Sequence, residues 1–368
     1  MTRILGDTLL LVYTTLPQDN LNKANTSAKE YEKKGFDGLL SMENAHDPFL
    51  PLAISSVVTK NIFLTTGIAI AFPRSPMVVA NACWDLQEAS GGRFVLGIGP
   101  QVKAHNERRF SVQWSSPVSR MREYVNSLRA IWNCWAHGEK LNFEGKHYHF
   151  TLMIPRFIPK STGQPSIPIT ISAVGPQMLK LAGEVADGVK LHPFCSVKYL
   201  EKIVLPLLNE GIKTNSKSRD CFEIMGGGFV ATGKNEEEVS LACNEVRQRI
   251  GFYGSTPNYW PVLEEHDLLD LGHELNIMAR EKKWDEMTKK IDDDVVRLFA
   301  AVGTHENIVK EIKNHFGNLV DSIYVGMLPT GDRNIDSDLL QEIQKIETKF
   351  KGLIIFEGVS KSVSPISR

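Results

Sequence analysis

Residues 90–99 read Ser-Gly-Gly-Arg-Phe-Val-Leu-Gly-Ile-Gly, and this stretch decides the fold class of the chain. A glycine turn leads into the wholly apolar run 94–96, which predicts a strand buried on both faces, as in a parallel sheet. Gly97 and Gly99 carry no side chains where this strand ends, so the backbone there can lie close to another group. Because α/β folds bind their ligands at the carboxyl ends of strands, we expect a ligand site beside these glycines.

Segments with strand and helix patterns alternate along the rest of the chain. The longest helix is predicted over 118–135, where apolar side chains recur at helical spacing and form a core-packing stripe. Eight segments have the apolar or β-branched composition of strands: 9–13, 38–42, 62–72, 94–98, 169–172, 189–192, 222–231 and 322–327. Eight strands separated by helices predict an α/β protein whose residues 1–357 form one closed (β/α)8 TIM barrel, with a doubly wound sheet as the alternative.

Several irregular segments interrupt this alternation. Residues 142–164 begin with a hairpin-like pattern and are too long for an ordinary connection, so we interpret them as a candidate lid. Residues 254–290 would either cover the barrel mouth or pair two subunits. Three consecutive glycines, 226–228, lie inside the seventh predicted strand and indicate a bulge or the close approach of a ligand. The Ser-rich and basic residues 358–368 predict a flexible tail.

Composition excludes several function classes. The chain has 42 basic and 43 acidic residues, a balance that gives no overall attraction to nucleic acid or to a membrane surface. Its five cysteines lack CxxC spacing, which favours free thiols over disulfides or a zinc site. No signal-peptide pattern opens the chain, and no apolar run is long enough to span a bilayer. We therefore expect a cytoplasmic enzyme that acts on a small molecule and forms a homo-oligomer, most simply a dimer.

A metal site is not expected. His147 and His149 have the alternate spacing of a metal-binding strand, but no cluster of carboxylates or cysteines accompanies them.

Six short motifs connect the chain with a known family. They lie at 35–38, 41–49, 66–69, 91–94, 173–176 and 186–188. In their order and spacing the chain resembles the luciferase-like flavin and deazaflavin oxidoreductases, and residues 45–49 and 102–110 are similar to the branch that uses coenzyme F-420. The resemblance implies a TIM-barrel enzyme that transfers a hydride between coenzyme F-420 and a small organic substrate. An FMN-dependent monooxygenase that uses O2 is one alternative, and a non-catalytic binding relative is another.

Backbone groups at strand ends are the contacts expected for the ring of such a cofactor. The resemblance implies a non-prolyl cis peptide bond at Gly67–Ile68 beneath the ring. Ala69 follows this bond, and Gly97 and Gly99 end the neighbouring strand. An ordinary buried strand glycine at position 67 is the alternative reading.

A phosphate site is expected where the fifth predicted strand meets its helix. Free N–H groups and the helix dipole favour an anion at such a terminus, although a tight strand-to-helix turn would need the same Gly-Pro pair. The residues assigned to this site are Ala173, Val174, Gly175, Pro176 and Gln177.

Polar side chains that follow the second strand are the first candidates for catalysis. Related dehydrogenases carry an acidic residue followed directly by histidine at this point, whereas here Glu43 is followed by Asn44 and the nearest histidine is His46. We expect His46 to act as acid or base, with a structural role at a helix start as the alternative, and Glu43 and Asn44 to contact the cofactor. The further candidates for proton transfer are His105, Glu107 and His192.

Overall fold

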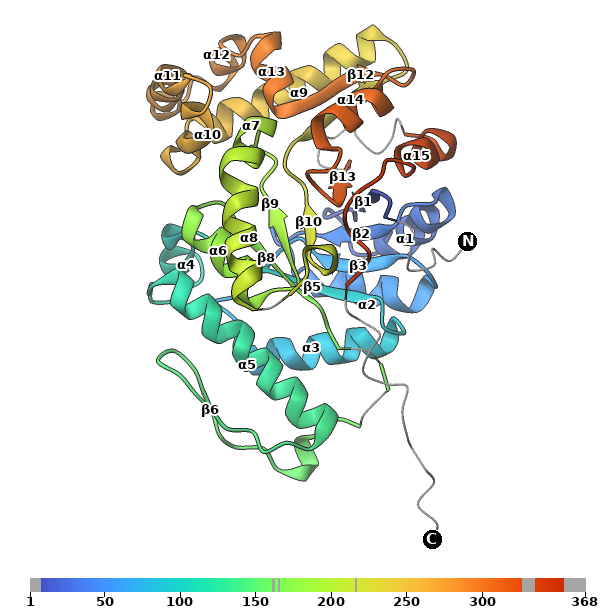
Figure 1. Ribbon diagram of the computed structural model, residues 1–368, viewed down its shortest axis with the longest axis vertical. Coiled ribbons are helices and arrows are strands. Elements are labelled where there is room, and N and C mark those ends of the chain that lie inside the picture. Colours follow the sequence, from blue (N-terminus) through green and yellow to red (C-terminus); the bar gives the residue numbers. More distant parts are fainter. Residues whose placement is uncertain (1–7, 161–162, 165, 216, 326–334, 354–368) are drawn as a thin grey trace.

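The computed structural model describes residues 8–160, 163–164, 166–215, 217–325 and 335–353. Parallel strands form a barrel at the centre of the molecule (Figure 1). Its strands are β1 (Leu11–Thr15), β2 (Gly38–Ser41), β3 (Phe63–Thr66), β5 (Phe94–Gly99), β8 (Ile169–Ala173), β9 (Gly188–Leu191), β10 (Glu223–Met225) and β13 (Ser322–Tyr324), with β4 (Ala69–Ile70) continuing β3. They follow the order β3-β2-β1-β13-β10-β9-β8-β5, and a pairing between β3 and β5 closes the ring. The predicted (β/α)8 barrel is therefore confirmed, and the doubly wound alternative is wrong.

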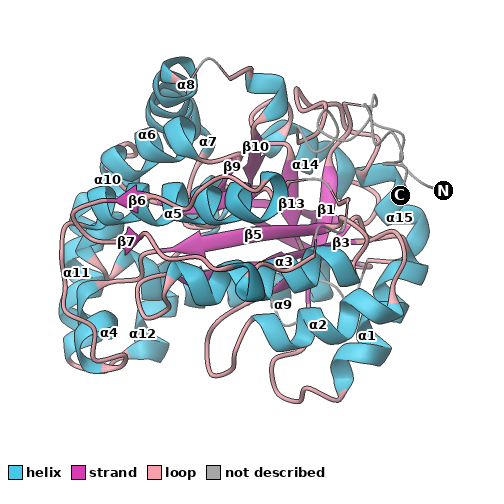
Figure 2. Cartoon of the chain, turned by 90° about the horizontal axis from the view of Figure 1, so that it is seen from below, coloured by secondary structure: helices cyan, strands magenta, loops and turns pink. Residues whose placement is uncertain are grey.

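Helices cover the outside of the barrel, as Figure 2 shows. The helices are α1 (Lys23–Lys34), α2 (Phe49–Val58), α3 (Pro76–Ala89), α4 (Lys103–Arg108), α5 (Pro117–His137), α6 (Pro176–Val185), α7 (Val197–Tyr199), α8 (Leu205–Thr214), α9 (Glu236–Gly254), α10 (Trp260–Glu264), α11 (Leu269–Arg280), α12 (Trp284–Lys289), α13 (Asp293–Phe299), α14 (Ile308–Phe316) and α15 (Ser337–Ile343). Of these, α10 to α13 form a group beside α9 at one end of the molecule (Figure 1). The long predicted helix over 118–135 corresponds to α5, whose apolar stripe is buried. Within the described residues, none of these helices is both long enough and apolar enough to cross a membrane.

Two small sheets lie outside the barrel. β6 (Phe143–Glu144) and β7 (His149–Phe150) pair antiparallel and form the hairpin predicted at the start of the candidate lid. Glu123 of α5 holds this hairpin, because its carboxylate accepts the backbone N–H groups of Lys146 (3.1 Å) and His147 (2.6 Å). The second small sheet pairs β11 (Phe229–Gly233) with β12 (Ala300–Thr304) in parallel.

Two predicted strands are divided in the structure. The third, 62–72, breaks at a cis peptide bond between Gly67 and Ile68, which separates β3 from β4. The seventh, 222–231, breaks at the glycine run into β10 and β11, because Gly226 and Gly227 have φ angles of +92° and +99° that only glycine adopts readily. Part of the eighth prediction, 326–327, and the predicted tail 358–368 lie outside the described residues.

Three aspartates that immediately precede barrel strands align those strands by the same pair of hydrogen bonds. In each case the aspartate N–H donates to the carbonyl of a residue at the start of the neighbouring strand, at 2.7–3.0 Å. Its carboxylate then accepts the N–H of that same residue, at 2.7–2.9 Å. The pairs are Asp37 with Val12, Asp187 with Ile169, and Asp321 with Ile224. These contacts fix the register at the amino-terminal end of the barrel, away from the end where ligands are expected.

Arg93, the arginine of the opening motif, also acts at the amino-terminal end. Its guanidinium donates to the carbonyl oxygens of Ser56 (3.1 Å), Thr59 (2.9 Å), Ile62 (2.6 Å) and Ser90 (2.7 Å). These carbonyls belong to the end of α2, the turn into β3 and the turn before β5. Arg93 therefore satisfies carbonyl groups that the end of a helix leaves without intrahelical partners, and its role is structural.

Replacing Arg93 by Ala should lower the free energy of unfolding by about 2–4 kcal/mol, because several half-buried carbonyls lose a charged donor. Urea unfolding followed by circular dichroism measures this change. Arg108→Ala, at an exposed position of α4, is the matched control and should change stability by less than about 0.5 kcal/mol. Equal effects of the two substitutions would contradict the structural role of Arg93.

Candidate functional site

The carboxyl ends of the barrel strands bring several predicted site residues together. A β carbon added to Gly99 would lie 3.0 Å from Oγ of Ser172 and 3.1 Å from Cδ1 of Ile68, so β4, β5 and β8 converge at this point. Ile68 and Ser172 are both partly exposed, although the strands around them are buried. We call this end of the barrel the mouth.

The cis peptide bond predicted at Gly67–Ile68 is present, and it lies at the mouth. The bulge that it forms is anchored on both sides. The Gly67 N–H donates to the Ser41 carbonyl of β2 at 2.7 Å. Oγ1 of Thr66 donates to the Gly97 carbonyl at 2.6 Å and accepts the Gly97 N–H at 2.9 Å. The bulge is thus built into the barrel between β2 and β5.

Packing inside the protein requires a glycine at position 97, and the sequence did not reveal this requirement. A β carbon at this position would lie 2.0 Å from the Thr66 carbonyl oxygen and 2.5 Å from Cε of Lys190. The groups that approach this glycine closely therefore belong to the protein itself. Contact of Gly97 with a cofactor remains a prediction.

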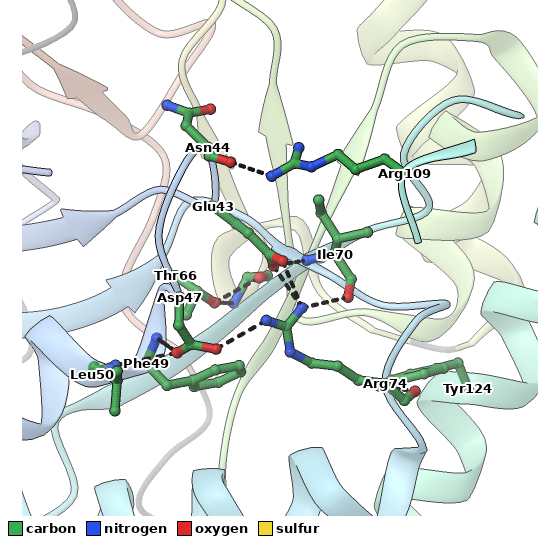
Figure 3. A network of polar contacts seen from close by, with 11 residues as sticks. Glu43, Asn44, Asp47, Phe49, Leu50, Thr66, Ile70, Arg74, Arg109 and Tyr124 are labelled. Carbon is green, nitrogen blue, oxygen red and sulfur yellow. Dashed lines mark hydrogen bonds and ion pairs between the residues drawn. The ribbon is translucent and has the colours of Figure 1, made fainter. Parts of the chain in front are cut away.

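Glu43 organises the segment that follows the bulge (Figure 3). Its carboxylate accepts the Ile70 N–H at 2.7 Å and the Nη1 of Arg74 at 2.7 and 2.8 Å. Nη2 of Arg74 donates to Asp47 at 3.0 Å. Burial works to lower the pKa of Arg74, but the bonds and charges of Glu43 and Asp47 outweigh it and raise that pKa. The Glu43 side chain is only 5 % exposed. Its bonds to Ile70 and Arg74 connect the loop after β2 with the segment after the bulge.

The two predicted clusters of polar side chains lie on the same side of the mouth. Arg109, which follows α4, donates to the carbonyl oxygen of Asn44 and so joins the loop after β2 to α4 (Figure 3). His46 in that loop is exposed, and so are His105 and Glu107 on α4. These groups are accessible to a ligand and to solvent, and their catalytic role remains a prediction.

The start of α6 is the helix terminus at which the anion site is predicted. Ala173 ends β8, and Gly175 caps the helix with extended backbone angles of φ −86° and ψ 159°. The side chains of the described residues leave this terminus open, because a β carbon on Gly175 would meet nothing within 4 Å. Gly175, Pro176 and Gln177 are exposed. Pro176 has no N–H, and the Met178 N–H donates to the Gly175 carbonyl at 3.1 Å, which leaves the Gln177 N–H for an anion. Phosphate binding at this terminus remains a prediction.

His192, which follows β9, is held as a neutral hydrogen-bond donor. Its Nδ1 accepts the Phe194 N–H at 3.0 Å, so the remaining proton of a neutral ring lies on Nε2. The ring packs against Tyr253 and Tyr259, with centroid distances of 4.2 and 4.6 Å. Burial lowers the pKa of His192 to about 3. Tyr259 belongs to segment 254–290, so this segment contributes to the wall beside His192.

Two charged residues that the sequence analysis did not identify as site residues lie in this part of the barrel. Arg74 lies just before α3 and binds both Glu43 and Asp47. Lys190 lies inside β9 and is 6 % exposed. A lysine in a strand predicted to be buried was the available signal, because lysine is almost never fully buried without a partner.

Comparison with known proteins agrees with this architecture. The family model of the luciferase-like monooxygenases matches residues 9–322. An uncharacterized protein of Mycobacterium tuberculosis is 42% identical over 305 residues, which cover 83% of this chain and 90% of that protein. A 5,10-methylenetetrahydromethanopterin reductase of Archaeoglobus fulgidus is 29% identical over 290 residues, covering 76% and 82% of the two chains.

A solved structure shows the same fold. It is a coenzyme F420-dependent tetrahydromethanopterin reductase from Methanopyrus kandleri, with a TM-score of 0.73 at 22% identity, covering 93% of this chain and 99% of that one. The closed barrel is the architecture of this class of oxidoreductases. The chain belongs to the luciferase-like monooxygenase family.

His192 should remain neutral, with its proton on Nε2, as the pH is lowered to 5. Nitrogen-15 NMR of the imidazole rings measures this directly, and His192→Gln assigns the signal. Because the pKa is below the unfolded value of about 6.5, His192 contributes stability above that pH, and the contribution is lost as the pH falls toward 3. An imidazolium signal from His192 near pH 6 would contradict this arrangement.

Proposed function

We propose that this protein transfers a hydride between coenzyme F-420 and a small organic substrate bound at the mouth of the barrel. The observation that carries the proposal is the combination, in one barrel, of the anchored Gly67–Ile68 bulge and the open start of α6. The bulge offers backbone to a planar ring, and the helix start offers the Gln177 N–H to a phosphate. Similarity to reductases whose names include coenzyme F420 or methanopterin supports this choice of cofactor.

The residues present fit such a cofactor. Gly67, Ile68 and Ala69 would lie along the ring, with Gly99 beside them. The phosphate would bind at the α6 terminus, from Ala173 to Gln177. Glu43 would act through Arg74 and Ile70, by holding the bulge. When bound, the deazaflavin supplies a ring carbon that accepts or donates a hydride.

The protein must move the proton that accompanies the hydride. When an alcohol carbon gives up a hydride, its hydroxyl proton leaves to a base, and the reverse reaction returns it. His46 is the first candidate for this acid or base, with His105 and Glu107 as further candidates. His192 remains neutral and can donate a hydrogen bond from Nε2 to a substrate oxygen, but at neutral pH it does not carry the extra proton.

An FMN-dependent monooxygenase on the same scaffold is the second candidate, favoured by the family to which the chain belongs. Reduced FMN reacts with O2, whereas a deazaflavin has carbon at the corresponding ring position and exchanges hydride. A third candidate is a binding protein without turnover, because Asn44 stands where related enzymes carry histidine. Oxygen consumption and turnover separate these three functions.

We expect the protein to act on a small-molecule substrate and to form a homodimer.

The protein should bind coenzyme F-420 more tightly than FMN. Fluorescence titration with each cofactor measures the two dissociation constants. Tight binding of FMN together with no response to coenzyme F-420 would favour the monooxygenase.

Gly175→Val tests the phosphate end within the same titration. Because the site of the added side chain is open, the variant should fold normally while blocking approach of an anion. Its affinity for coenzyme F-420 should fall about tenfold or more, equivalent to about 1.4 kcal/mol. Gly138→Val, at an open position after α5, is a less perfect control because Gly138 has a φ of +70°. A folded Gly175→Val protein with unchanged affinity would place the phosphate elsewhere.

His46→Ala should lower turnover by roughly 10²- to 10⁴-fold, the usual effect of losing a general acid or base, and leave cofactor affinity within a few-fold. Steady-state kinetics and titration separate the two effects. His137→Ala, at an exposed position at the end of α5, is the matched control. Near-normal turnover of His46→Ala would assign that histidine a structural role and direct attention to His105 and Glu107.

A further inference from the structure

The interior of the barrel holds a lysine that forms no direct ion pair with a carboxylate of the described residues. Lys190 is 6 % exposed, and its Nζ lies 3.1 Å from the thioether Sδ of Met225. Among the described residues, that sulfur is its only hydrogen-bond acceptor. A thioether is a weak acceptor, so this ammonium is poorly satisfied inside the protein.

The Lys190 side chain crosses the interior of the barrel at the level of Gly97, below the mouth. Its Cε lies 2.5 Å from the position that a β carbon of Gly97 would take, and β8 separates β5 from β9 in the sheet, so the side chain passes through the interior. Gly97 is two residues before Gly99, the last residue of β5. Two residues of a strand span about 7 Å. The ammonium is therefore close beneath the point where Ile68, Gly99 and Ser172 converge.

The groups around the ammonium leave its charge only partly compensated. Glu223 is 1 % exposed and accepts a hydrogen bond from Ser322 Oγ at 2.7 Å, at the amino-terminal end of the barrel. The ring of Tyr13 has its centroid 6.0 Å from Nζ. Burial lowers the pKa of Lys190 to about 8, partly opposed by Glu223, and burial raises the pKa of Glu223. At pH 7 the lysine still carries its proton.

We propose that Lys190 tunes the reduction potential of the cofactor ring bound at the mouth, by stabilising the reduced form more than the oxidised form. This inference rests on the proposed function. A hydride consists of one proton and two electrons, so the ring that forms the new C–H bond gains one negative charge. A fixed positive charge beneath the ring, in a low-dielectric interior that salt does not screen, attracts that added charge. Lys190 acts through the electric field of its positive charge and is not a catalytic residue.

The test compares affinities for the two redox states of the cofactor. Dissociation constants of oxidised and reduced coenzyme F-420 are measured anaerobically for the wild type and for Lys190→Met, which keeps the length of the side chain. The preference for the reduced form should fall about tenfold in the variant. For a two-electron couple, this corresponds to a midpoint potential about 30 mV lower.

Two further variants separate charge from packing. Met225→Leu changes the neighbour of the ammonium without changing charge, and it should keep the wild-type preference. Lys190→Gln replaces Lys190→Met if the latter does not fold, as judged by thermal unfolding.

The outcomes distinguish this inference from the proposed function. An unchanged preference in the lysine variant, or an equal loss in Met225→Leu, overturns the role of Lys190. If the wild type binds FMN and not coenzyme F-420, the choice of cofactor fails, and the same comparison with FMN decides the role of Lys190. If neither cofactor binds the wild type, the proposed function fails, and this inference fails with it.

Discussion

The structure depends on the contact between Thr66 and Gly97, which joins the two strands whose pairing closes the barrel. The carbonyl of Thr66 occupies the space that a β carbon at position 97 would need, and the Thr66 hydroxyl bonds both the N–H and the carbonyl of Gly97. This contact joins β3 to β5 where the cis bulge begins. It also leaves room for Lys190 to cross the interior. Closure of the barrel, the bulge and the buried charge therefore depend on one glycine.

Residues with structural roles lie at one end of the barrel, and the exposed polar groups lie at the other. At the amino-terminal end, Asp37, Asp187 and Asp321 align strands, and Arg93 satisfies the carbonyls at the end of α2. Burial works to raise the pKa of Asp187, but Arg129 and Lys217 outweigh it and hold that pKa below its ordinary value. At the mouth, by contrast, polar groups such as His46 and the start of α6 are exposed. Stability and ligand access thus depend on different residues.

The wall of the mouth combines segments that are distant in the sequence. Tyr259 from segment 254–290 packs on His192 after β9, while Arg109 after α4 binds the loop after β2. The aromatic neighbours keep His192 neutral by excluding water, and its bond from Phe194 fixes which nitrogen carries the proton. The wall beside the mouth is therefore built by segments outside the barrel strands.

The sequence by itself determined most of the strand positions and the helix start at Gly175, because each depends on local hydrophobic pattern, glycine or proline. The closed barrel was predicted with a doubly wound sheet as the alternative, and the cis bond at Gly67–Ile68 was expected only from the family resemblance, so the tertiary structure decided both. Only the tertiary structure decided how charges pair. Arg74 reaches Glu43 across 31 positions of the chain, and Lys190 lies against Gly97 from two strands away. The glycine run 226–228 was predicted to mark a bulge or the close approach of a ligand, and the structure shows that Gly226 and Gly227 divide the seventh predicted strand. Such contacts follow from the closing of the barrel, which places distant side chains in one low-dielectric interior where local patterns carry no information.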